Sequence, residues 1–150
     1  MTILGASLGL ILVLIAGLHV LWAFSTWPFP NRERMLRSMS GTLLPPDWTQ
    51  PRPIPLPAYF VVAFLLLLAS ALVAIAAGLC ALSMPHGFLR AGVFCVAGVF
   101  LLRGGGGLLA FRRLGPRVAP EFLYWDSRIY SPLCLVLGVG VAVVGFGLVV

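Results

Sequence analysis

The chain has 150 residues, of which 61% are hydrophobic and only 9% are charged. A soluble domain carries about 25% charged residues, because polar groups must cover its surface, so this composition excludes a soluble globular protein. All ten basic residues are arginine, and with four acidic residues they give a net charge of +6. Because the arginines stand mostly between apolar runs, they indicate membrane lipids as partners and exclude nucleic acid.

Four apolar runs are long enough to cross a bilayer, which takes about 20 mainly apolar residues. The first covers about residues 3–24 and is predicted to be a retained span, because no positive segment or small-residue cleavage site marks it as a signal peptide. The others cover about residues 58–84, 87–111 and 130–150. The chain is therefore predicted to be an all-α integral membrane protein, a single membrane domain forming a four-transmembrane-helix bundle.

The two segments that follow the first and third runs, residues 25–57 and 112–129, carry most of the arginines. Both segments lie on the same side of a four-span chain. Because positive charge accumulates in cytoplasmic loops, both are predicted to be cytoplasmic, with both termini outside.

Small residues indicate where the helices approach one another. Gly5 and Gly9, and likewise Gly138 and Ala142, are spaced four apart, which lets backbones come close in a bilayer. We expect these pairs to pack within the chain, with a homodimer as the alternative. The run RGGGG, which starts at Arg103, lacks the spacing of a phosphate-binding loop. Its glycines are expected to let a neighbouring helix, or Arg103 itself, come close.

Several chemically active side chains are predicted to share one level near the cytoplasmic ends of the spans. With Arg128 from the preceding loop they form a candidate ligand site, which consists of His19, Trp22, Arg103, Arg128, Tyr130, Ser131 and Cys134. An arginine inside a span is costly and suggests a functional site. Three interpretations of Arg103 stay open: it binds a ligand, its side chain reaches up to the headgroups, or it pairs with Asp126 or Glu121.

His19 is expected to be a neutral ring that hydrogen-bonds across helices rather than a metal ligand, since no histidine or carboxylate follows it at helical spacing. Cys80, Cys95 and Cys134 have neither disulfide nor metal spacing. No nucleophile elbow surrounds Ser131. We therefore expect no metal and no cofactor.

Three motifs, HVLWAFSTWP, FLLRGGGG and DSRIYSPLCLVLG, resemble a bacterial four-span membrane family known as domain of unknown function 3995. The resemblance covers nearly the whole chain and implies the bacterial inner membrane, but it implies no activity. The positions that carry it are His19, Trp22, Trp27, Pro28, Arg103, Arg128, Tyr130, Ser131, Pro132 and Cys134.

The leading functional hypothesis is a small membrane protein that binds an amphipathic molecule, such as a lipid or quinone, at this polar layer. In it Arg103 and Arg128 hold an anionic head, while His19 and Tyr130 supply hydrogen bonds. One alternative is an enzyme acting on a lipid-soluble substrate, with His19 or Tyr130 as the proton donor. The other is a structural or immunity-type partner of another membrane protein.

Overall fold

The computed structural model describes residues 1–39, 53–82, 84–111 and 118–148. Within these residues every regular element is a helix. Four helical segments are long and apolar enough to cross a membrane, namely Thr2–Phe24, Leu56–Ala76, His86–Leu109 and Pro120–Phe146. The prediction of an all-α four-helix bundle is confirmed.

Large apolar side chains cover the outer surface of these helices. Ile3 is 85% exposed, Phe64 65%, Leu102 78% and Val136 67%. A soluble protein does not leave so much contiguous apolar surface to water, whereas the hydrocarbon of a bilayer covers it without cost. The chain is therefore a multi-pass membrane protein.

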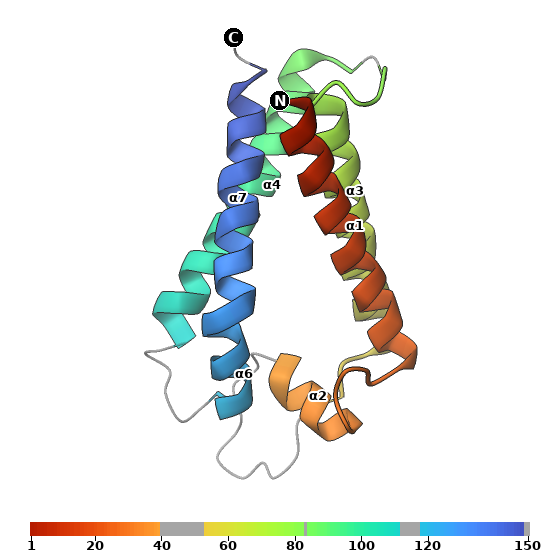
Figure 1. Ribbon diagram of the computed structural model, residues 1–150, viewed down its shortest axis with the longest axis vertical. Helices are drawn as coiled ribbons and strands as arrows, with labels where there is room; N and C mark the ends of the chain where they lie inside the picture. Colours follow the sequence, from red (N-terminus) through yellow and green to blue (C-terminus); the bar gives the residue numbers. More distant parts are fainter. Residues whose placement is uncertain (40–52, 83, 112–117, 149–150) are drawn as a thin grey trace.

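The spanning helices associate as two pairs (Figure 1). Helix α1 (Thr2–Phe24) packs along α3 (Leu56–Ala76), and α4 (His86–Gly106) packs along α7 (Ser131–Phe146). The pairs converge at the end that carries both termini and diverge toward the other end, where α2 (Arg32–Met39) and α6 (Pro120–Trp125) lie. The bundle thus has a narrow end and a wide end.

The narrow end holds the main core, to which all four spanning helices contribute. Leu12, Val73, Val93 and Val141 are fully buried there. Glycines make this convergence possible, because a Cβ at Gly5 would overlap the Cβ of Ala77, and Ser70 Oγ donates a 3.0 Å hydrogen bond to the carbonyl of Gly9. The expected packing of Gly5 and Gly9 within the chain is confirmed.

We predict that Gly5→Leu lowers the free energy of unfolding by about 2 kcal/mol, because a side chain there must force α1 away from α3. The control is Gly17→Leu on the same helix, where an added Cβ meets nothing within 4 Å. Unfolding both variants with SDS in mixed micelles measures the difference. Equal stability of the two would contradict close packing of α1 on α3.

The second spanning helix ends at Ala76, earlier than the expected limit near residue 84. Gly78 terminates it with φ +73°, a left-handed conformation that glycine adopts at little cost. The amide of Leu79 then donates a 2.9 Å hydrogen bond to the carbonyl of Ala74, and the amide of Gly78 a 3.0 Å bond to that of Ile75. This is a Schellman cap, which satisfies carbonyls that the helix end leaves open.

The last helical segment begins at Pro120 rather than near Tyr130, so residues 120–129 are helical and not a loop. Proline suits a first turn because its missing N–H has no partner there, and Glu121 favours the positive end of the helix dipole. The expected loop of residues 25–57 likewise contains α2, whose start is capped by a 2.9 Å bond from the Arg34 amide to Asn31 Oδ1. Residues 40–52 and 112–117, expected in the two loops, lie outside the described residues.

Candidate ligand site between the helix pairs

A cavity of about 410 Å³ lies between the two helix pairs, where they diverge. The spanning helices and α2 all contribute to its wall. It is lined by Ile15, Leu18, His19, Trp22, Met39, Val62, Leu66, Phe100, Arg103, Ile129, Tyr130, Leu133, Cys134 and Leu137. We call this space the inner cavity.

The lining of the inner cavity changes character along the bundle axis. Toward the narrow end it consists of aliphatic groups, among them Ile15 on α1 and Leu137 on α7. Toward the wide end, His19 follows Ile15 by about one turn on α1, Tyr130 precedes Leu137 by about two turns, and Arg103 follows Phe100 by about one turn on α4. The inner cavity is therefore largely apolar, and its polar side chains gather toward the wide end, beside Trp22 and Met39.

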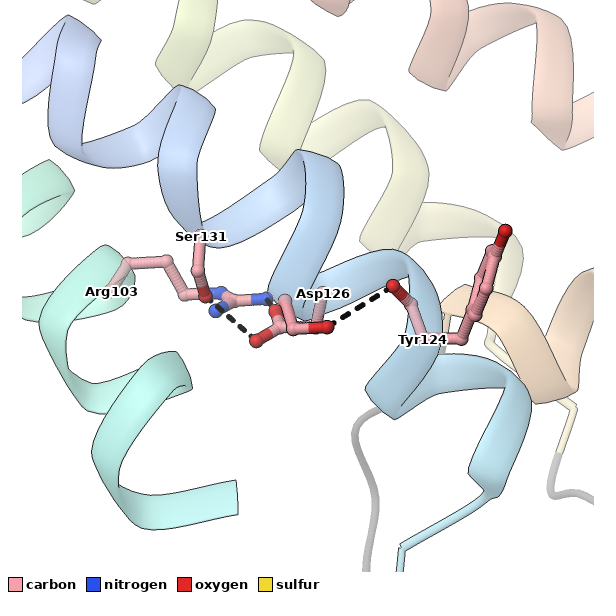
Figure 2. A network of polar contacts seen from close by, with 5 residues as sticks. Arg103, Tyr124, Asp126 and Ser131 are labelled. Atoms are coloured by element: carbon pink, nitrogen blue, oxygen red, sulfur yellow. Dashed lines mark hydrogen bonds and ion pairs between the residues drawn. The ribbon is translucent and has the colours of Figure 1, made fainter. Parts of the chain in front are cut away.

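A partly buried ion pair joins α4 to the last helix beside this cavity (Figure 2). Arg103 Nη2 donates to Asp126 Oδ1 at 2.7 Å, and Ser131 Oγ donates to Asp126 Oδ2, also at 2.7 Å. The Asp126 side chain is only 3% exposed, whereas that of Arg103 is 39% exposed. Of the three interpretations of Arg103, pairing with Asp126 is confirmed.

Two glycines of the RGGGG run make room for this ion pair. A Cβ at Gly107 would overlap Ser131 Oγ and would lie 2.7 Å from Asp126 Oδ2. A Cβ at Gly104 would lie 2.8 Å from the carbonyl oxygen of Ser131. Since Gly105 and Gly106 face no atom within 4 Å, the expected close approach is confirmed at the two positions that share a helix face.

Both helices widen next to the ion pair. The π-helical segment η1 (Gly107–Phe111) follows α4, and the π-helical segment η3 (Asp126–Tyr130) joins α6 to α7. Each segment begins with a residue that contacts Ser131. Single π-helical turns inside longer helices occur often at functional sites, which agrees with a site at this level.

His19 makes its hydrogen bond within its own helix. Its Nδ1 lies 2.8 Å from the carbonyl oxygen of Ile15, so the expectation of a bond across helices is wrong. A carbonyl only accepts, hence Nδ1 carries a proton, and in the neutral form of the ring Nε2 is an acceptor. Within the described residues Nε2 has no hydrogen-bond partner, and the ring lines the inner cavity.

The ring of Trp22 packs against the ring of His19. The two rings meet edge to face with centroids 5.4 Å apart, and Trp22 Nε1 donates a 2.8 Å hydrogen bond to the carbonyl of Trp27. Only 7% of Trp22 is exposed. It belongs to an apolar cluster at the wide end that consists of Trp22, Ala23, Met35, Leu36 and Tyr59. Trp22 is therefore a fixed wall of the inner cavity.

The structure brings five of the seven expected site residues to the inner cavity: His19, Trp22, Arg103, Tyr130 and Cys134. Ser131 is fully buried behind the wall, where its hydroxyl is bonded to Asp126. Arg128 is exposed and points elsewhere, with its guanidinium carbon 4.1 Å from the centre of the Tyr124 ring. The described residues contain no group of three or more histidine, cysteine or carboxylate side chains able to hold a metal ion.

Sequence reasoning underrated Asp126 and Gly107. The sequence indicated Asp126 only as one possible partner of Arg103, because residues 112–129 were expected to form a loop. The signal was present in Pro120 and Glu121, a helix start that would have placed Asp126 inside the last spanning segment. Gly107 stands four residues after Arg103, which places it on the same helix face.

The chain was compared with protein families, curated proteins and solved structures. The family described as "Protein of unknown function (DUF3995)" matches residues 12–141, a range that includes every residue of the inner cavity. No curated protein and no solved structure matches the chain. The motifs around His19, Arg103 and Tyr130 thus stand within the family's matched range, and the chain belongs to this family of unknown function, DUF3995.

Proposed function

We propose that this protein binds an amphipathic, lipid-like molecule in the inner cavity. The observation that carries the proposal is one largely apolar cavity whose polar side chains, His19, Arg103 and Tyr130, gather toward the wide end. A volume of about 410 Å³ falls within the range of about 300–1,000 Å³ that is typical of small-molecule sites. The ligand's head lies among His19, Arg103 and Tyr130, and its apolar part begins against Ile15 and Leu137.

A neutral head group fits this site better than an anion held by two arginines. Asp126 already balances the charge of Arg103, and Arg128 does not line the inner cavity. His19 offers an acceptor at Nε2, and the phenol of Tyr130 both donates and accepts. A hydroxyl-bearing head satisfies these groups, whereas an anion would compete with Asp126 for Arg103.

We further propose that the wide end faces the cytoplasm of a bacterial cell, across its inner membrane. Arg32, Arg34, Arg37 and Arg128 stand at the wide end, while Arg90 stands near the start of α4 at the narrow end. Positive charge favours the cytoplasmic side. Both termini are then outside, and the ligand's head lies near the cytoplasmic headgroups.

Cys134→Trp tests the proposed site, because a bulky indole fills the inner cavity from α7. In native mass spectrometry of detergent-extracted protein, we expect the wild type to carry a discrete small-molecule adduct and Cys134→Trp to retain about tenfold less, a loss of about 1.4 kcal/mol in binding. The matched control is Val136→Trp on the same helix, which is 67% exposed and should keep the adduct.

A wild type that carries no adduct beyond bulk lipid contradicts the proposal. Co-purification of one specific protein in that case would favour the structural or immunity-type alternative. Equal retention by Cys134→Trp and Val136→Trp would place the adduct outside the inner cavity.

A further inference from the structure

A second cavity of about 340 Å³ lies between α3 and α4. Apolar side chains and the thiol of Cys95 form its lining, and several of them are exposed, including Leu65 at 55% and Val99 at 61%. We call this the outer groove. Because such exposed apolar groups face the bilayer, the outer groove opens toward lipid.

The outer groove adjoins the inner cavity. Val62, Leu66 and Phe100 line both spaces. α3 packs mainly on α1, and α4 mainly on α7, so the contact between α3 and α4 is short. They touch near the narrow end, where a Cβ on Gly92 would lie 3.4 Å from Leu72. The boundary between the two spaces therefore consists of three apolar side chains from two loosely packed helices.

We propose that the outer groove holds the hydrocarbon tail of the ligand, which passes between Val62, Leu66 and Phe100 while its head stays in the inner cavity. This inference rests on the proposed function and names the ligand class: a neutral, hydroxyl-bearing amphiphile with one long chain. A compact ligand would fill the inner cavity alone. A long chain needs the outer groove as well, and it enters sideways from the bilayer without crossing water.

The lining that the outer groove shares with the inner cavity favours this occupant over a second copy of the chain. The three shared side chains are all apolar, which suits contact with a narrow chain of methylene groups. In water, burial of such groups is itself a driving force for binding. In a bilayer that driving force is absent, so the proposed path would select a ligand by shape and set its orientation.

The three native cysteines report on three places in one experiment. Cys134 lines the inner cavity, Cys95 lines the outer groove, and Cys80 is exposed in the turn after α3. The full chain in detergent micelles is treated with N-ethylmaleimide, with and without 1-oleoylglycerol, and each thiol's modification rate is followed by mass spectrometry. At about ten times the dissociation constant, the rates at Cys134 and Cys95 should fall about tenfold, because only unoccupied protein reacts. The rate at Cys80 should not change.

A matched pair of variants tests the proposed path itself. Val62→Trp places an indole at the boundary, whereas Val61→Trp lies on the neighbouring position, which lines neither space. Val62→Trp should lose the protection of Cys95 by 1-oleoylglycerol, and Val61→Trp should keep it. Protection of Cys95 in both variants would overturn the inference.

The outcomes separate the two proposals. Protection of Cys134 without protection of Cys95 overturns the tail path and leaves the proposed function standing. Protection of neither thiol contradicts the proposed function, and the inference falls with it. Protection of Cys95 alone, or a Cys95 rate that rises when the protein is diluted, means that bulk amphiphile or a second copy covers the outer groove, and the inference is wrong.

Discussion

Replacing Asp126 with alanine is expected to lower the free energy of unfolding by about 3 kcal/mol. Removal of one partner from a buried ion pair costs about 3–5 kcal/mol, because the remaining charge loses its compensation. The lower end applies here, since the Arg103 side chain is 39% exposed and can turn toward water or headgroups. The hydroxyl of Ser131 loses its acceptor in the same variant.

SDS unfolding in mixed micelles, followed by tryptophan fluorescence, measures this loss. The control is Glu33→Ala, which breaks the exposed pair between Glu33 and Arg37 on α2 and should cost no more than about 0.5 kcal/mol. The double variant Arg103→Met with Asp126→Leu should recover most of the stability, because apolar groups replace both charges. A double variant as unstable as Asp126→Ala would show that the destabilisation does not come from an uncompensated charge.

Replacing Gly107 with alanine is expected to cost about 2 kcal/mol, although the change adds a single methyl group. The new Cβ overlaps Ser131 Oγ and lies 2.7 Å from both Arg103 Nη1 and Asp126 Oδ2. Overpacking of this kind costs about 1–3 kcal/mol. The ion pair must then shift, or α4 must move away from α7.

Gly105→Ala and Gly106→Ala are the controls, because an added Cβ at either position meets nothing within 4 Å. They should be neutral or stabilising by up to about 1 kcal/mol, since alanine favours helix more than glycine does. Adding Ser131→Ala to Gly107→Ala removes the overlapping atom. The double variant should therefore lose less stability than the sum of the losses of the two single variants. Equal stability of Gly107→Ala and Gly106→Ala would contradict the close approach.

The comparison of His19 with Arg103 shows how far sequence reasoning reaches into the site. The presence of both residues near one level followed from their distance to the ends of the apolar runs, and both line the inner cavity. The hydrogen-bond partners of the two side chains did not follow from the sequence. His19 bonds to Ile15, a local choice of rotamer, and the partner of Arg103 depended on where the last helix begins.

The sequence by itself determined that the chain is a multi-pass helical membrane protein, because apolar runs about 20 residues long have no other stable environment. It also indicated that Gly5 and Gly9 allow close contact, since small residues at helical spacing mark faces that can approach, whereas the structure alone singled out Gly104 and Gly107 within the RGGGG run. Only the tertiary structure decided that the helices form two diverging pairs, that Asp126 neutralises Arg103, and that Arg128 stays outside the inner cavity. Those results depend on which faces meet across segments far apart in the chain, and nearly uniform apolar helices carry little periodicity to specify that choice.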